Sequence, residues 1–262
     1  MPSDRWKAAL RCVTRPATLT IHHHIVNTAV TRSATTSLQS VLQAQELALP
    51  AHDGVLRGWL ARTDSDHGLV VVPRGDAPEQ ANAALIQVLR AAGVSALLVD
   101  LLTVEEQADT RLASSRRYEL ERLALRLVGA TDSLMDELNT ETPVGYFGTG
   151  MESAAVLAAA AQRPALVSAV VLCDGRPLLA EPALPQVRAP TLLIVPEQDL
   201  ALVRLNRAAI GRLLCEKQLA LVPGAHRLLQ ESSVVPRVAR LARDWFERRL
   251  RLDAVLESAV TK

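Results

Sequence analysis

From Glu46 to Phe246, short apolar runs alternate with longer segments that have helical spacing. Runs such as 68–73, 94–99 and 167–173 are continuous, which is typical of strands buried on both faces of a parallel sheet. Segments such as 77–92 and 119–138 have the periodicity of amphipathic helices, and Gly93 is suited to end the first of them. Strands that alternate with helices predict a mostly parallel sheet covered by helices on both faces.

The residues ahead of this alternation predict an antiparallel hairpin. Segments 46–49 and 55–62 have strand character, and Asp53-Gly54 between them is a hairpin turn signal. Later in the chain the same reasoning predicts strands at 144–147, 191–195 and 218–222, helices at 151–162 and 201–215, a Pro-rich loop after Cys173, and a last helix that ends in Trp245-Phe246. The sequence therefore predicts an α/β fold that starts with a hairpin.

Residues 1–44 differ from the rest because they are rich in Ser, Thr and Arg and nearly free of acidic residues. They have no clear strand or helix period, so we expect a poorly structured segment ahead of a domain at 45–262. Nothing in them resembles a secretory signal, although an organellar transit peptide has a similar composition. The run His22-His23-His24 lacks metal-ligand spacing and is interpreted as a solvated polar run.

Composition excludes several classes of function. The formal net charge is +1, which gives no argument for a nucleic-acid partner. No apolar stretch is long enough to span a membrane. Three cysteines without CxxC spacing favour a reducing, cytoplasmic compartment, with organellar targeting by residues 1–44 left open. No phosphate-binding glycine motif and no Cys/His metal spacing is present, so we expect neither a cofactor nor a metal.

The most informative stretch is Gly148-Thr149-Gly150-Met151-Glu152, between a predicted buried strand and a predicted helix. In this setting α/β-hydrolases place the nucleophile elbow Gly-x-Ser-x-Gly. The third position here is Gly150, which has no side chain and cannot attack a substrate. The setting predicts a hydrolase, while the nucleophile is missing.

Four stretches together resemble the α/β-hydrolase fold, and within it the small, lidless dienelactone-hydrolase-like proteins. They are Tyr146-Phe147-Gly148 before an Ala-rich helix, then 170–177, 189–199 and 222–226. Their order along the chain, with the nucleophile position first, then an acid and then a histidine, is the order of this fold. The resemblance covers the chain from Glu46 to Arg248 and implies an α/β-hydrolase domain.

The resemblance implies a catalytic acid and base late in the chain. Asp199 matches the triad acid, and its second interpretation is an N-cap of the following helix. His226 matches the triad base, whose ring Asp199 would orient, and its second interpretation is a surface histidine on a retained scaffold. The spacing before His226 differs by one residue from the usual family spacing, which bears on where the ring points.

Other residues of the elbow leave alternatives for the nucleophile. Ser153 is the nearest hydroxyl beyond the turn and would serve if the strand ran three residues further, whereas Thr149 would point to the other side. Glu152 stands where the motif has a small residue. A carboxylate there suits a helix N-terminus but would repel an oxyanion.

The oxyanion loop that the family places after its third strand is reduced here to Arg74-Gly75. Arg74 replaces the family's histidine and either binds an anion at the mouth of the cleft or is a solvated loop residue. With Met151 and Glu152, these two residues are the candidates for a ligand or oxyanion pocket.

The leading prediction is a catalytically impaired dienelactone-hydrolase-like protein, which binds a small carbonyl or anionic ligand or serves as a partner subunit. One alternative is an active ester or lactone hydrolase that uses Ser153 or a water activated by His226. Another is an interaction protein without a ligand. We expect no nucleic-acid or membrane partner, and the sequence does not indicate an oligomeric state.

Overall fold

The computed structural model describes residues 43–64, 67–103, 106, 116–138 and 142–250. The predicted N-terminal segment, apart from its last two residues, lies outside these ranges, and so does the histidine run at 22–24.

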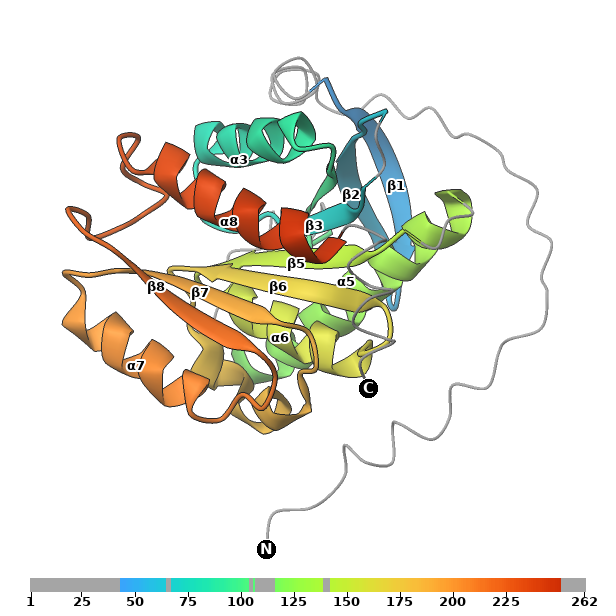
Figure 1. Ribbon diagram of the computed structural model, residues 1–262. Helices are drawn as coiled ribbons and strands as arrows, with labels where there is room; N and C mark the ends of the chain where they lie inside the picture. Colours follow the sequence, from blue (N-terminus) through green and yellow to red (C-terminus); the bar gives the residue numbers. More distant parts are fainter. Residues whose placement is uncertain (1–42, 65–66, 104–105, 107–115, 139–141, 251–262) are drawn as a thin grey trace, which may run out of the picture. The chain divides into compact units, whose positions relative to one another are not determined.

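An eight-stranded sheet forms the centre of the described domain (Figure 1). Its strands are β1 (Gln45–Ala51), β2 (Gly54–Ala61), β3 (Leu69–Pro73), β4 (Ser95–Val99), β5 (Val144–Thr149), β6 (Val167–Cys173), β7 (Thr191–Pro196) and β8 (Lys217–Val222). They lie in the order β1-β2-β4-β3-β5-β6-β7-β8. The six strands β4, β3, β5, β6, β7 and β8, in sheet order, run parallel to one another. β1 and β2 form an antiparallel hairpin, and β2 pairs with β4 in antiparallel orientation. The predicted fold class is confirmed.

Helices cover both faces of this sheet (Figure 1). α3 (Glu79–Ala91) and α8 (Val235–Leu250) lie on one face. α5 (Arg116–Leu138), α6 (Glu152–Gln162), α7 (Leu200–Ile210) and the 3-10 segment η2 (Pro177–Gln186) lie on the other. No described helix combines the length with the apolar character that crossing a membrane would require.

The hydrophobic core consists of two clusters, one on each face of the sheet. Alternate residues of a strand point to opposite faces, so Val70 and Val72 belong to the α3/α8 cluster while Leu69 and Val71 belong to the other. Both sets are buried, which explains why the sequence of β3 is continuously apolar.

The described elements differ from the predicted ones in three places. The Pro-rich segment after Cys173 forms η2 rather than an irregular loop; its internal Pro182 and Pro185 have no N–H to donate to an α-helix. α7 ends at Ile210, five residues before the predicted end at Cys215. α8 continues past Phe246 to Leu250, whose side chain is buried.

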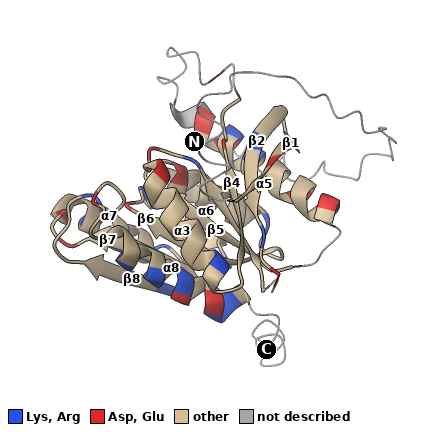
Figure 2. Ribbon diagram, turned by 90° about the horizontal axis from the view of Figure 1, so that it is seen from above, with Lys and Arg blue, Asp and Glu red and all other residues tan. Residues whose placement is uncertain are grey.

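Basic and acidic residues are mixed along α8 (Figure 2). Arg248 is exposed, whereas the guanidinium of Arg249 stacks over the ring of Trp245 and pairs with Glu216. This arrangement is typical of the polar face of a surface helix.

Candidate functional site

The carboxyl ends of the parallel strands meet along one edge of the sheet, and ligands of open α/β sheets bind outside such ends. The β5–α6 turn, the residues after β6 and β7, the loop after β8 and the β3–α3 loop all lie at this edge. Every predicted site residue is in one of these segments.

The elbow between β5 and α6 is a sharp turn around Gly150. This residue has a positive φ of 47°, which glycine adopts at little cost. Its N–H donates to the carbonyl of Cys173 at 3.2 Å, and its own carbonyl accepts from the Arg176 N–H at 3.1 Å. A Cβ at Gly150 would meet only Glu152 Oε2 within 4 Å, at 3.9 Å. The turn therefore has room for a side chain that the chain does not supply.

Ser153 lies inside the elbow. Its side chain is fully buried; its hydroxyl donates to the Gly150 carbonyl at 2.6 Å and accepts from the Arg176 N–H at 2.8 Å. A Cβ at Gly175 would come within 3.0 Å of the Ser153 side chain, so the two chain segments are tightly packed there. Ser153 thus joins the start of α6 to the segment after β6.

Glu152 begins α6 and turns its carboxyl toward the β3–α3 loop. A Cβ at Gly75 would lie 2.3 Å from Glu152 Oε2, so the carboxyl rests directly on this glycine. Burial raises the pKa of Glu152, and the nearby charges of Asp76 and Glu119 raise it further. Met151, the N-cap residue of α6, is partly buried beside it.

The guanidinium of Arg74 contacts neighbouring acidic residues and a tryptophan ring. It lies 3.5 Å from Asp100 Oδ1 and 3.5 Å from Glu79 Oε1, and it stacks over the ring of Trp59 at 5.7 Å from the centroid. Asp100 is buried and also lies 3.5 Å from Arg57. These neighbours offset the positive charge of Arg74, for which the sequence left open anion binding or a solvated position in the loop.

Asp199 and His226 lie at the same edge, after β7 and β8. Asp199 Oδ1 accepts from the Leu202 N–H at 2.9 Å, which confirms the predicted N-cap role. The His226 side chain is exposed, and its backbone N–H donates to Glu231 at 2.9 Å. Within the described part of the chain, the His226 ring forms no hydrogen bond to Asp199 or to another residue. The triad roles of both residues stay predictions.

Asp174 is a residue of this edge that sequence reasoning missed. It follows β6, has a positive φ of 51°, and its Oδ2 accepts from the Leu228 N–H at 2.8 Å. Burial raises its pKa to about 6; Asp199 also raises it, while the Leu228 and Leu229 amides and Arg227 act in the opposite direction. The available signal was an acidic residue directly after a buried strand and before a glycine.

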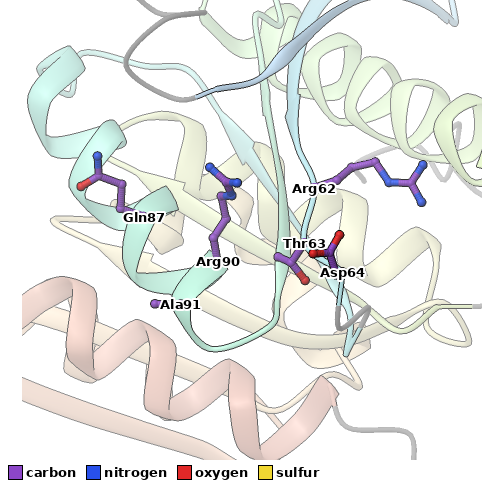
Figure 3. A pocket seen from close by; sticks show the side chains of 6 residues that line it. All are labelled: Arg62, Thr63, Asp64, Gln87, Arg90 and Ala91. Atoms are coloured by element: carbon purple, nitrogen blue, oxygen red, sulfur yellow. The ribbon is translucent and has the colours of Figure 1, made fainter.

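A separate hollow of about 470 Å³ lies away from the elbow (Figure 3). Its walls come from the end of β2 and the end of α3, at the amino ends of the parallel strands, and the lining residues are Arg62, Thr63, Asp64, Gln87, Arg90 and Ala91. The hollow is open to solvent and shares no residue with the candidate site.

The comparisons with known proteins agree with this architecture. No family model matches the chain. A dienelactone hydrolase from Anabaena variabilis is 41% identical, with 80% of this chain and 100% of that chain covered and a TM-score of 0.74. Est1E from Butyrivibrio proteoclasticus is 14% identical over 77% of this chain and 98% of that chain, with a TM-score of 0.61, which supports the fold alone.

Two curated proteins of Mycobacterium tuberculosis are each 37% identical over 209 residues, which is 78% of this chain and 46% of theirs. Both carry the provisional name phosphoribosyl transferase. The chain thus spans about half the length of the curated relatives it matches.

The sheet order, the helices on both faces and the elbow at the end of β5 define an α/β-hydrolase fold. Given its likeness to the Anabaena variabilis protein over that protein's whole length, the chain belongs to the dienelactone-hydrolase-like α/β-hydrolases.

Proposed function

We propose that this protein is a dienelactone-hydrolase-like α/β-hydrolase that has lost nucleophilic catalysis and keeps its site for binding a small ligand. The observation that carries this proposal is Gly150, which takes the sharp positive-φ turn of the elbow without a side chain. Covalent acyl transfer needs an oxygen or sulfur nucleophile within reach of a base. Apart from its chain neighbours, the one atom of the described elbow within 4 Å of a Cβ at Gly150 is the carboxyl oxygen Oε2 of Glu152, at 3.9 Å, and no hydroxyl or thiol lies there.

The other residues of the site support impaired catalysis. Glu152 places an acidic group between the elbow and the β3–α3 loop, where a hydrolase needs donors for a developing oxyanion. Within the described residues the exposed ring of His226 makes no hydrogen bond to Asp199, and the carboxylate beside His226 is that of Glu231. Asp199 and His226 are therefore interpreted as retained triad positions.

The alternative of an active ester or lactone hydrolase depends on Ser153 or on a water activated by His226. The two hydrogen bonds of the buried Ser153 hydroxyl disfavour its use as the nucleophile. Activation of a water by the exposed His226 is a separate hypothesis, and it predicts an esterase rate that depends on His226.

A second candidate function is that of an accessory unit for phosphoribosyl transfer. Two observations favour it: the provisional name of the curated relatives, and the 46% of their length that this hydrolase-fold chain matches. In this hypothesis the phosphoribosyl-transfer chemistry belongs to the other part of those proteins. The hydrolase-fold unit would then contribute binding rather than catalysis.

The first test measures hydrolysis of p-nitrophenyl butyrate and a simple lactone by the wild type and by His226→Ala. We expect equal rates, because the nucleophilic route is absent. A reproducible rate that falls in His226→Ala would overturn the loss of catalysis.

The second test restores the nucleophile. Gly150→Ser should become labelled at position 150 by an organophosphonate probe, as read by mass spectrometry, whereas Gly150→Ala is the matched control that adds the same backbone strain without a hydroxyl. The positive φ should cost about 1–3 kcal/mol of folding free energy in both variants. Labelling of the wild type at Ser153 would show that the elbow uses another register.

A further inference from the structure

We propose that Glu152 closes the candidate site from within. Its carboxyl rests on Gly75 of the β3–α3 loop and occupies the place that an uncharged carbonyl group of a ligand would take. The proposal rests on the proposed function because it uses the same elbow, with Gly150 at the nucleophile position.

The contact between Glu152 and Gly75 is close. A Cβ at Gly75 would lie 2.3 Å from Oε2, 2.6 Å from Cδ and 3.1 Å from Oε1 of Glu152, and these are its three nearest atoms. Gly75 is not one of the positive-φ glycines, so its backbone does not demand glycine. The lack of a side chain at position 75 is therefore explained by the carboxyl that lies over it.

The same carboxyl reaches the elbow on its other side. A Cβ at Gly150 would lie 3.9 Å from Glu152 Oε2, an ordinary van der Waals distance. The backbone N–H of Glu152 itself also interacts with the carboxyl at the start of α6. Glu152 thus bridges the β3–α3 loop and the elbow, the two segments between which a hydrolase of this fold holds its substrate carbonyl.

The charges around Glu152 decide which ligand fits this place. Asp76 in the β3–α3 loop and Glu119 in α5 both act to raise the pKa of Glu152, in addition to burial. Arg74, the basic residue of the same loop, is directed at Asp100 and Glu79. An anion is repelled by Asp76 and Glu119 in such surroundings, whereas an uncharged amide group is not.

The first experiment uses Gly75→Ala, whose methyl group would displace the carboxyl of Glu152. The readout is the pKa of the Glu152 side chain from an NMR titration of glutamate carboxyl carbons. In the wild type, the pKa of Glu152 should lie above the ordinary glutamate value; in Gly75→Ala it should fall toward that value. Gly211→Ala is the matched control, because a Cβ there would have its nearest contact at 3.5 Å and lies beyond α7.

Closure is wrong if the pKa of Glu152 in the wild type equals the ordinary glutamate value, or if Gly75→Ala leaves it raised. Should Gly75→Ala fail to fold, the same contact is tested from the other side. Glu152→Gln should keep the amide chemical shifts of Gly75 and Gly150 close to those of the wild type, while Glu152→Ala should move both. If the amide chemical shifts of Gly75 and Gly150 change by the same amount in the two variants, the proposal is also overturned.

The second experiment tests the class of ligand, with acetamide as the probe. In Glu152→Ala, acetamide should shift the amide signals of Gly75 and Gly150 in a saturable way, and in the wild type the same response should need a higher acetamide concentration, because the ligand must first displace the carboxyl of Glu152. Acetate at pH 8 should shift neither. A saturable response to acetate instead of acetamide, or a response to neither, would overturn the assignment of an uncharged carbonyl. These readouts are independent of turnover, so they stand or fall separately from the loss of catalysis.

Discussion

Asp174 is the residue whose protonation has the clearest consequence for stability. Its Oδ2 accepts a hydrogen bond from the Leu228 N–H, while its Oδ1 is buried and makes no hydrogen bond to a described residue. A carboxylate that is desolvated at one oxygen is disfavoured when charged, which agrees with the pKa of about 6. Because this value is raised, folding favours the protonated form. The stability that Asp174 contributes is present at acidic pH and is lost as the pH rises through about 6.

We predict that Asp174→Asn stabilises the protein at pH 8 by about 1–2 kcal/mol and changes its stability little at pH 4. Asparagine keeps an oxygen for the Leu228 amide, tolerates a positive φ and carries no charge. Urea unfolding at the two pH values measures the effect. Asp199→Asn is the control, because asparagine caps a helix as well as aspartate does and should leave the stability nearly unchanged. An equal effect of Asp174→Asn at both pH values would contradict the assignment.

At the scale of elements, Arg126 fastens the N-terminal hairpin and the segment after β4 to α5. Its guanidinium is buried; it donates to both carboxylate oxygens of Asp53 at 2.6 and 3.0 Å and to the Leu101 carbonyl at 2.9 Å, and it also pairs with Glu106. Arg126 lowers the pKa values of Asp53 and Glu106, mainly through these hydrogen bonds. The hairpin turn and the segment after β4 are therefore both tied to α5 by one side chain.

We predict that Arg126→Met destabilises the protein by about 3 kcal/mol at pH 7, because the two carboxylates lose their cation. Arg122→Met is the matched control; Arg122 also lies on α5 and pairs with Glu106, but it is partly exposed and should cost less than about 1 kcal/mol. The lowered pKa values stabilise the wild type above about pH 4, and this contribution is lost as the pH falls. The difference between wild type and Arg126→Met should shrink on acidification; a constant difference would show that packing, not charge, is responsible.

At the scale of the whole molecule, the described core lies within one α/β domain. Both hydrophobic clusters are built from residues between 44 and 250, on the two faces of the same sheet. The largest buried apolar side chains, which include Trp59, Trp245 and Phe246, belong to these clusters. The domain is expected to fold from these residues.

We predict that a chain starting at Gln43 unfolds cooperatively, with a melting temperature within a few degrees of the full chain. This corresponds to about 1 kcal/mol for a domain of this size. Circular dichroism during heating measures the change. Insolubility of the shortened chain, or a broad transition, would show that residues 1–42 contribute to the fold.

The sequence by itself determined the elements and their order. Burial on both faces makes a parallel strand apolar throughout, so Val167–Cys173 was predicted with its observed bounds. The Asp53-Gly54 signal located the hairpin turn, and the elbow at Gly150 followed from the strand that ends beside it. These features depend on residues close together in the chain, which is why local periodicity and turn chemistry reveal them.

Only the tertiary structure decided which side chains meet at the carboxyl edge of the sheet. The bond between Asp174 and Leu228 joins residues 54 positions apart, and the pairing of Arg126 with Asp53 joins residues 73 positions apart. The contact between the Glu152 carboxyl and Gly75 depends on β3 and β5 being neighbours in the sheet, although β4 lies between them in the chain. A local sequence pattern cannot predict such contacts. The order of the strands in the sheet brings distant loops together, and these loops decide which side chains are buried and which charges lie near them.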